Sequence, residues 1–343
     1  MVKFPKDISI FKNSLYKYKD SWFYELDQST PEDNYIQINK NDYAFTYLDF
    51  KTPNNKGGNS IILNLFQNQD IIIDTPKNPI YPDSPNRIIK IEKRPIYVPK
   101  FGNVIPSRFE KEIEALHQCN AMNFQNIIKI FEDGICEIYN PKNDKFDKHR
   151  FYTMEYAPYD LKNFIEVKSA DLNFEIKLYL CLSLAKGLEE LRQLNYYHRD
   201  IKPDNIFFVA DNWKIGDLGL LAERNKQYEI DTVAESIGPK GWMSPESMNK
   251  YLTEGKGFPY QYDCLIDHRS DIFQLGKVYW YIFNFNAPIG CIKPIDMNFQ
   301  NNDIYPIIRR MLNHNKIKRF STIKDVIVEL ERISLKYLKS VTN

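Results

Sequence analysis

The stretch H-R-D-I-K-P-D-N, residues 198–205, and the tripeptide D-L-G, residues 217–219, decide how this sequence is interpreted. Asn205 and Asp217 offer oxygen ligands of the kind that Mg²⁺ takes alongside substrate phosphates. Asp200 is suited to accept a proton from a hydroxyl group, and Lys202 is suited to neutralise developing charge. The two segments therefore predict a site for phosphate and metal, with a charged solvent-exposed loop as the alternative.

Two short apolar segments surround a polar turn between these motifs. Residues 206–209 and 213–215 have the composition of strands, and residues 210–212 have that of a turn. A hairpin here would bring the two ends of the site, Asn205 and Asp217, close together.

The octapeptide resembles the catalytic loop of eukaryotic-type protein kinases, H-R-D-x-x-x-x-N, and D-L-G is similar to the family's D-F-G. Lys202 corresponds to the serine/threonine form of that loop. The resemblance covers residues 43–335 and implies an α+β, bilobal fold. Its small β-rich N-lobe contains one helix, and its larger C-lobe is mainly helical. It also implies ATP and Mg²⁺ in the cleft, with Asp200 and Lys202 catalytic and with Asn205 and Asp217 binding the metal.

A glycine-containing loop joins two strand-like segments, residues 43–48 and 61–66. The pair Gly57-Gly58 alone is typical of an ordinary turn, because glycine permits positive φ. In context, the loop resembles a divergent kinase glycine-rich loop, with Asn55 and Ser60 in place of the first and third glycines. The nucleotide-binding residues that this resemblance implies are Gly57, Gly58, Asn59, Ser60 and Ile62.

Lys90 lies in an apolar strand, residues 87–91, that resembles the family's V-A-I-K strand. For the strand taken alone, the alternative is a lysine that extends to water. The long gap after Ile62 predicts an insertion at about residues 67–86. Ser107 is expected to cap a helix, and helical geometry places Glu112 at the inward edge of its apolar stripe. The resemblance implies that Glu112 orients Lys90 toward the α- and β-phosphates. The alternative for Glu112 is a carboxylate at the rim of the structure.

Residues 127–131 and 151–156 predict two further strands. The second resembles the strand that leads into the inter-lobe hinge, whose main-chain groups bind adenine. Met154 then corresponds to the gatekeeper, and Glu155 to Ala157 correspond to the hinge. The expected domains are an N-terminal extension (1–42), an N-lobe (43–157) and a C-lobe (158–343).

A long polar segment runs from Asp217 to Glu246 and ends in S-P-E, where the kinase family has A-P-E. Long segments without regular structure are uncommon in compact domains unless they are functional, and this one resembles an activation segment. Arg199 suggests that a phosphate on Thr232 or Ser236 orders the segment through a charge-assisted contact.

Two charged residues in the C-terminal half predict buried pairs. Asp271 begins a helix that is apolar on all sides, residues 270–282, so its carboxylate needs partners. The resemblance identifies those partners as the backbone of the catalytic loop, and it pairs Arg319 with Glu246. Ordinary surface charges are the alternative for both.

The composition excludes several classes of protein. The 343 residues carry 46 Lys and Arg against 45 Asp and Glu, so no global field favours nucleic acid or a membrane surface. The five cysteines show no C-x-x-C spacing, which fits a reducing compartment. The N-terminus lacks the apolar run of a signal peptide. We therefore expect a cytoplasmic protein that acts on protein substrates, with neither nucleic acid nor membrane as partner.

Three classes of function stay open at this point. The intact Asp200, Asn205 and Asp217 favour an active serine/threonine protein kinase. The divergent glycine-rich loop and the insertion before Lys90 motivate the alternative, a pseudokinase scaffold that binds partners without catalysis. A small-molecule phosphotransferase would share the Asp and Asn chemistry but is not expected to carry S-P-E.

Overall fold

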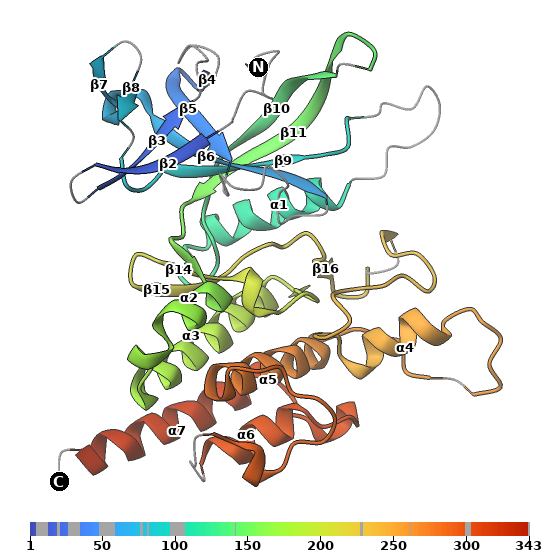
Figure 1. Cartoon of the computed structure of the whole chain (residues 1–343). Coiled ribbons are helices and arrows are strands. Elements are labelled where there is room, and N and C mark those ends of the chain that lie inside the picture. Colours follow the sequence, from blue (N-terminus) through green and yellow to red (C-terminus); the bar gives the residue numbers. More distant parts are fainter. Residues whose placement is uncertain are drawn as a thin grey trace. The chain divides into compact units, whose positions relative to one another are not determined.

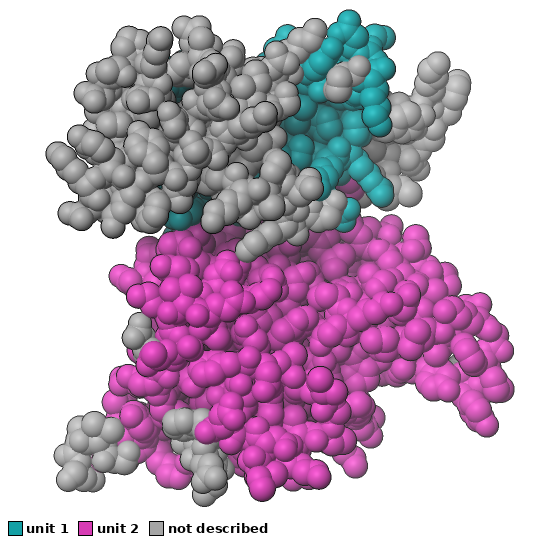
Figure 2. Space-filling model, viewed as in Figure 1, with its two compact units in different colours: residues 1–105, 129–156 teal, residues 106–128, 157–343 magenta. Residues whose placement is uncertain are grey.

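The structure, a computed structural model, describes residues 1–4, 13–18, 21–26, 35–47, 59–75, 78–80, 82–96, 107–140, 142–226, 229–260, 262–298 and 303–341. The chain forms two compact units, which Figure 2 shows in different colours. Unit 1 consists of residues 1–105 and 129–156, and unit 2 of residues 106–128 and 157–343. Within the part of the chain that the structure describes, none of the helices is both long and apolar enough to cross a membrane.

Unit 1 is built on a seven-stranded sheet with the strand order β1-β10-β11-β9-β6-β5-β4 (Figure 1). Neighbouring strands are antiparallel, except that β1 runs parallel to β10. The strands of this sheet are β1 (Val2–Lys3), β4 (Tyr35–Ile38), β5 (Asn41–Tyr47), β6 (Ser60–Gln67), β9 (Arg87–Glu92), β10 (Ile130–Asn140) and β11 (Lys145–Glu155). A separate hairpin consists of β2 (Asn13–Tyr18) and β3 (Ser21–Leu26).

Residues near the N-terminus are part of the core of unit 1. Phe4 is buried against Phe45 of β5, with the ring centroids 5.1 Å apart in an edge-to-face arrangement. The predicted N-lobe boundary at residue 43 falls inside β5, so β1 and β4 extend the sheet with residues that the sequence analysis assigned to an N-terminal extension.

The segment between β6 and β9, where the sequence predicts an insertion, forms a short 3₁₀ turn, Asn68–Asp70, and a hairpin of β7 (Ile72–Thr75) and β8 (Asn78–Ile80). Asn86 closes its base. The Oδ1 of Asn86 accepts the N–H of Gln67 at 2.6 Å, and its Nδ2 donates to Asp70 Oδ2 at 2.8 Å. Because β6 and β9 pair directly, Lys90 lies opposite Ile62 despite the residues between them.

The predicted strand at residues 127–131 is wrong at its start, because β10 begins only at Ile130. The residues before it pair elsewhere, in unit 2. Ile128 N–H donates to Ile215 O at 2.9 Å, and Ile215 N–H donates to Asn126 O at 2.8 Å. This long-range pairing determines where β10 begins.

Unit 2 is mainly helical. Its helices are α1 (Arg108–Ala121), α2 (Leu161–Lys168), α3 (Phe174–Gln193), α4 (Pro245–Thr253), α5 (His268–Asn284), α6 (Ile304–Met311) and α7 (Ile323–Val341). Its short strands are β12 (Tyr159–Asp160), β13 (Tyr196–Tyr197), β14 (Ile206–Val209), β15 (Asn212–Ile215) and β16 (Ala222–Glu223). The predicted hairpin is confirmed as β14 and β15, and the predicted central helix is confirmed as α5, which is buried over most of its surface.

Helix α1 begins with a capping box. The Oγ of Ser107 accepts the N–H of Glu110, and the Glu110 side chain accepts the N–H of Ser107, as the predicted cap requires. The helix belongs to unit 2, whereas the sequence analysis placed it in the N-lobe.

The predicted pair of Glu246 and Arg319 is confirmed. Arg319 Nη2 donates to Glu246 Oε1 at 2.7 Å, and Nη1 donates to Oε2 at 3.2 Å. The guanidinium also donates to the backbone carbonyls of Arg269, Asn313 and His314. Both side chains are buried, so this pair connects the first turn of α4 to the start of α5 and to the segment after α6.

We expect Arg319→Gln to lower the free energy of unfolding by about 3–5 kcal/mol, because it leaves the carboxylate of Glu246 buried without a cation. The matched control is Arg332→Gln, because Arg332 pairs with Glu329 at a position where both side chains are largely exposed. Loss of that surface pair should cost only about 0.2–1 kcal/mol. Urea denaturation followed by circular dichroism measures both variants. Equal losses in the two variants would contradict a stabilising role for the buried pair.

Candidate active site

Helix α5 holds the main chain of residues 198–205 in place. Asp271 Oδ2 accepts the N–H of His198 at 2.8 Å, and its Oδ1 accepts the N–H of Arg199 at 2.7 Å. One turn later, Gln274 accepts the N–H of Ile201 at 3.1 Å and donates to the carbonyl of Arg199 at 3.1 Å. The predicted contact between Asp271 and the backbone of this loop is therefore confirmed.

Burial raises the pKa of Asp271 to about 7, although the two N–H donors favour the ionised carboxylate. Arg199, which receives one of these bonds, has φ of 68°, in the left-handed region that residues other than glycine rarely adopt. The hydrogen bonds from α5 stabilise the loop and so offset the cost of this left-handed backbone conformation.

His198 is a neutral link between the loop and the segment before Asp217. Its Nδ1 accepts the N–H of Asp200 at 3.2 Å, so the proton lies on Nε2, which donates to the carbonyl of Gly216 at 3.1 Å. Burial lowers the pKa of His198 to about 4. The neutral imidazole thus connects the backbone N–H of Asp200 to the carbonyl of Gly216 through its two ring nitrogens.

The two carboxylate oxygens of Asp200 have different surroundings. Oδ2 accepts a bond from Lys202 Nζ at 2.8 Å and one from Asn205 Nδ2 at 2.9 Å. Oδ1 is buried and has no hydrogen-bond partner among the described residues. Gly238, with φ of 84°, lies nearby, and a Cβ at that position would be 3.6 Å from Oδ1. One oxygen is therefore fixed and the other is left without a partner.

The pKa of Asp200 is raised by burial and also by the nearby negative charge of Asp217. The ammonium group of Lys202 and the amide of Asn205 act in the opposite direction. The carboxylate is thus a stronger base than an exposed aspartate, and Lys202 limits that increase.

Asn205 and Asp217 supply oxygen atoms suited to a cation. The Nδ2 of Asn205 donates to the carbonyl and to Oδ2 of Asp200, while its Oδ1 makes no hydrogen bond within the described part of the chain. Asp217 Oδ1 lies 3.3 Å from the position that a Cβ on Gly219 would take, and Glu112 Oε2 lies 3.8 Å from the same position. Glycine therefore allows both acidic side chains to approach the D-L-G backbone.

This donor set fits Mg²⁺ that is bound together with phosphate. Among the described residues, no group of three or more His, Cys, Asp or Glu side chains is arranged to hold a metal by itself. Mg²⁺ typically takes one or two side-chain oxygens and completes its shell with phosphate oxygens and water. Asn205 and Asp217 match that requirement.

Lys90 and Glu112, which the sequence analysis paired, belong to unit 1 and unit 2, respectively. Lys90 is 5% exposed on β9, so the alternative that its side chain extends into water is wrong. Glu112 is 1% exposed on α1, so the alternative of a carboxylate at the rim is also wrong. The pairing of the two residues stays a prediction.

The predicted nucleotide-binding residues are described only in part. Gly57 and Gly58 lie outside the described residues. Ser60 begins β6, and Asn59 accepts the N–H of Lys93 through its carbonyl at 3.0 Å. Glu155 ends β11, where its main-chain N–H donates to the carbonyl of Lys129 at 3.1 Å. Ala157 follows as the first residue of the second stretch of unit 2.

The structure adds residues that sequence reasoning missed. Gln274 contacts the loop through both atoms of its amide, and Gly238 leaves space beside Asp200. Gln274 carried a usable signal, because it is a polar residue one turn after Asp271 in a largely apolar part of the helix. The signal for Gly238 was weaker, because glycine also occurs in ordinary turns.

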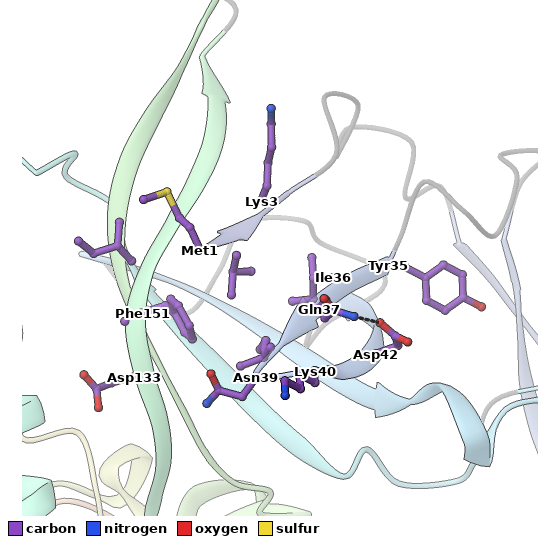
Figure 3. A pocket seen from close by; sticks show the side chains of 14 residues that line it. Met1, Lys3, Tyr35, Ile36, Gln37, Asn39, Lys40, Asp42, Asp133 and Phe151 are labelled. Carbon is purple, nitrogen blue, oxygen red and sulfur yellow. Dashed lines mark hydrogen bonds between the residues drawn. The ribbon is translucent and has the colours of Figure 1, made fainter.

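A cavity of about 690 Å³ lies in unit 1, where residues 1–3, residues 35–40 and the middle of β10 come together (Figure 3). Many of the labelled side chains that line it are polar or charged. Two of them are hydrogen-bonded, because Gln37 Nε2 donates to Asp42 Oδ1 at 3.0 Å. None of the predicted catalytic, metal-binding or nucleotide-binding residues lines this cavity.

Comparison of the sequence with known proteins identifies the family of this chain. The model of the protein kinase domain matches residues 93–338. A probable serine/threonine-protein kinase of Clostridium perfringens is 26% identical over 256 residues, which are 68% of this chain and 33% of that protein. Serine/threonine-protein kinase dst2 of Dictyostelium discoideum is 28% identical over 191 residues, which are 55% of this chain and 14% of that protein.

A third relative, eukaryotic translation initiation factor 2-alpha kinase 1 of Plasmodium falciparum, is 30% identical over 166 residues, 47% of this chain and 10% of that protein. The chain spans about a third or less of the length of these relatives. The matched region includes the catalytic loop, D-L-G and S-P-E, and it begins after Lys90. Because this match covers most of its length, the chain belongs to the eukaryotic-type protein kinase family, whose domain has two lobes.

Proposed function

We propose that this chain is an active protein kinase that transfers the γ-phosphoryl group of ATP to serine or threonine hydroxyls of protein substrates. The observation that carries the proposal is the unequal environment of the Asp200 carboxylate. Lys202 and Asn205 hold Oδ2, whereas Oδ1 is buried without a partner among the described residues. A buried acceptor without a hydrogen bond is costly, and the hydroxyl of a substrate would satisfy it.

The proposed chemistry follows from these positions. Asp200 Oδ1 accepts a hydrogen bond from the substrate hydroxyl, orients its oxygen and takes its proton as the oxygen attacks phosphorus. The raised pKa of Asp200 makes the carboxylate a better base for this step. Lys202 Nζ, 2.8 Å from Oδ2, contributes positive charge next to the transferring group.

Asn205 Oδ1 and the carboxylate of Asp217 would hold Mg²⁺, which when bound neutralises charge on the triphosphate. In unit 1, Lys90 would bind phosphate oxygens, with Glu112 of α1 as its proposed partner. Residues 57–60 and Ile62 would cover the nucleotide, and the main chain of Glu155 and Ala157 would contact adenine. In this proposal the kinase N-lobe ends near residue 157, and residues 158–343 form the C-lobe.

Specificity for serine and threonine is supported by Lys202, whose position relative to Asp200 resembles the serine/threonine form of the loop. It is also supported by two relatives, a probable serine/threonine-protein kinase and serine/threonine-protein kinase dst2. Pro239 stands at a position where many serine/threonine kinases carry a threonine. The preference of this chain for one hydroxyl is therefore tested by comparing its activity on serine, threonine and tyrosine peptides.

We expect Asp200→Asn to lower kcat/KM by about 10²-fold or more, because an amide cannot accept the proton. The measurement is transfer of radiolabelled γ-phosphate from ATP in the presence of Mg²⁺ to generic protein substrates. Asp211→Asn, at the exposed turn between β14 and β15, is the matched control and should leave transfer unchanged. Equal transfer by wild type and Asp200→Asn would contradict the proposal, and absence of transfer from wild type would favour the scaffold alternative.

Lys202→Met should move the acidic limb of the profile of kcat/KM against pH to higher pH. Lys202 lowers the pKa of Asp200 through its charge and its hydrogen bond, so removal of the ammonium raises that pKa. The base is then lost to protonation at a higher pH than in the wild type. Lys186→Met, on an exposed position of α3, serves as the control. An acidic limb that stays in place or moves to lower pH would show that Lys202 does not act on the base.

A further inference from the structure

Arg199, which precedes Asp200, uses all of its side-chain nitrogens within unit 2. Its Nε donates to the carbonyl of Leu220 at 2.7 Å. Its Nη1 and Nη2 hold the two carboxylate oxygens of Asp231 at 2.5 Å and 3.0 Å. Both side chains are almost completely buried, at 0% and 1% exposed. This is a charge-assisted bidentate pair, the geometry in which arginine also binds phosphate.

A second arginine reaches the same carboxylate from α1. Arg108 Nη2 lies 3.0 Å from Asp231 Oδ1 and 2.8 Å from Glu235 Oε1. The other oxygen of Glu235 accepts the N–H of Thr232 at 2.9 Å. Two arginines and two carboxylates thus balance in charge. Among the described residues, Arg108 Nη1 is left without a hydrogen-bond partner.

Helix α4 holds the same segment from another side. Glu254 Oε2 accepts the N–H of Ala234 at 2.9 Å and a bond from Lys250 Nζ at 2.8 Å. Val233 packs against Gly255, where a Cβ would lie 2.6 Å from Val233 Cγ1. Residues 231–235 therefore contact residue Arg199 of the 198–205 loop, α1 and the residues directly after α4.

The expectation that Arg199 binds a phosphate on Thr232 or Ser236 stays a prediction. In this structure the guanidinium of Arg199 is paired with Asp231. Thr232 and Ser236 are exposed. A phosphate there would add about −1.5 to −2 charge beside the carboxylates of Asp231 and Glu235. Arg199 already uses all of its side-chain nitrogens.

We propose that Asp231 is a positioning residue that replaces an activating phosphate. Its carboxylate holds Arg199, and through Arg199 the backbone of Asp200, in the described arrangement without phosphorylation of the segment. This inference rests on the proposed function, because it concerns how Asp200 is kept ready for transfer. It implies that the active conformation is encoded by an aspartate and is not switched by modification of Thr232 or Ser236.

The first test compares phosphatase-treated proteins in initial-rate phosphoryl transfer. Wild type should be active, and the double variant Thr232→Ala/Ser236→Ala should stay within about twofold of it. Asp231→Asn should lose about 10-fold or more in kcat, because it removes a buried charge-assisted pair. Adding Arg199→Gln to Asp231→Asn should cost less than the product of the two single effects, since both residues act through one contact.

The second test measures the position of the segment without any catalysis. Asp231→Asn should accelerate amide hydrogen exchange in residues 231–238 more than in α5, and it should also lower the melting temperature, because the buried guanidinium of Arg199 loses its anionic partner. Asp263→Asn is the matched control, because Asp263 pairs with Lys316 but is half exposed. This control should leave exchange in residues 231–238 as it is in wild type.

Two results would overturn the inference. One is a phosphatase-treated wild type that is inactive and regains activity only when Thr232 or Ser236 is phosphorylated. The other is Asp231→Asn with wild-type activity and unchanged exchange. If no protein transfers phosphate, yet Asp231→Asn accelerates exchange in residues 231–238, the proposed function fails while the positioning role of Asp231 is supported.

Discussion

The arrangement of the candidate site depends on one buried carboxylate, that of Asp271. It accepts the N–H groups of two consecutive residues, His198 and Arg199, and both bonds persist only while Arg199 keeps a left-handed backbone. That backbone lets the Arg199 side chain reach Asp231. The hydrogen bonds that orient Asp200 start from the same fixed loop. A helix in the core of unit 2 thus holds the backbone of the candidate site through Asp271, with Gln274 one turn later.

Sequence reasoning succeeded where the signal is local or where chemistry demands a partner. The cap at Ser107 follows from neighbouring residues, and the need of Asp271 for partners follows from the cost of burying charge. The pairing of Glu246 with Arg319 came from the resemblance to the kinase family. Sequence reasoning failed where a residue pairs with a segment that is distant in the sequence. The backbone of Ile128 was expected in the same strand as Ile130, but it pairs with Ile215. It also failed for Asp231, because nothing in a polar segment marks which acid folds back onto Arg199.

Membership of the protein kinase family is shown by a match that starts at Lys93, so the lysine strand lies just outside it. The structure supplies independent information there. Lys90 occupies a central strand of the sheet, between β6 and β11, in regular antiparallel register with both. In unit 2, Lys202 and Asn205 are hydrogen-bonded to Asp200.

The hairpin between β6 and β9 has a practical consequence for anyone who wishes to label this protein. Asn86 closes the base of the hairpin through Gln67 and Asp70, and the two flanking strands pair with each other directly. The register that places Lys90 is set by this direct pairing, and Ile71 between the two strands is buried with Ala44 and Phe66. A fluorophore site or an affinity epitope in this segment should therefore leave Ile71 in place.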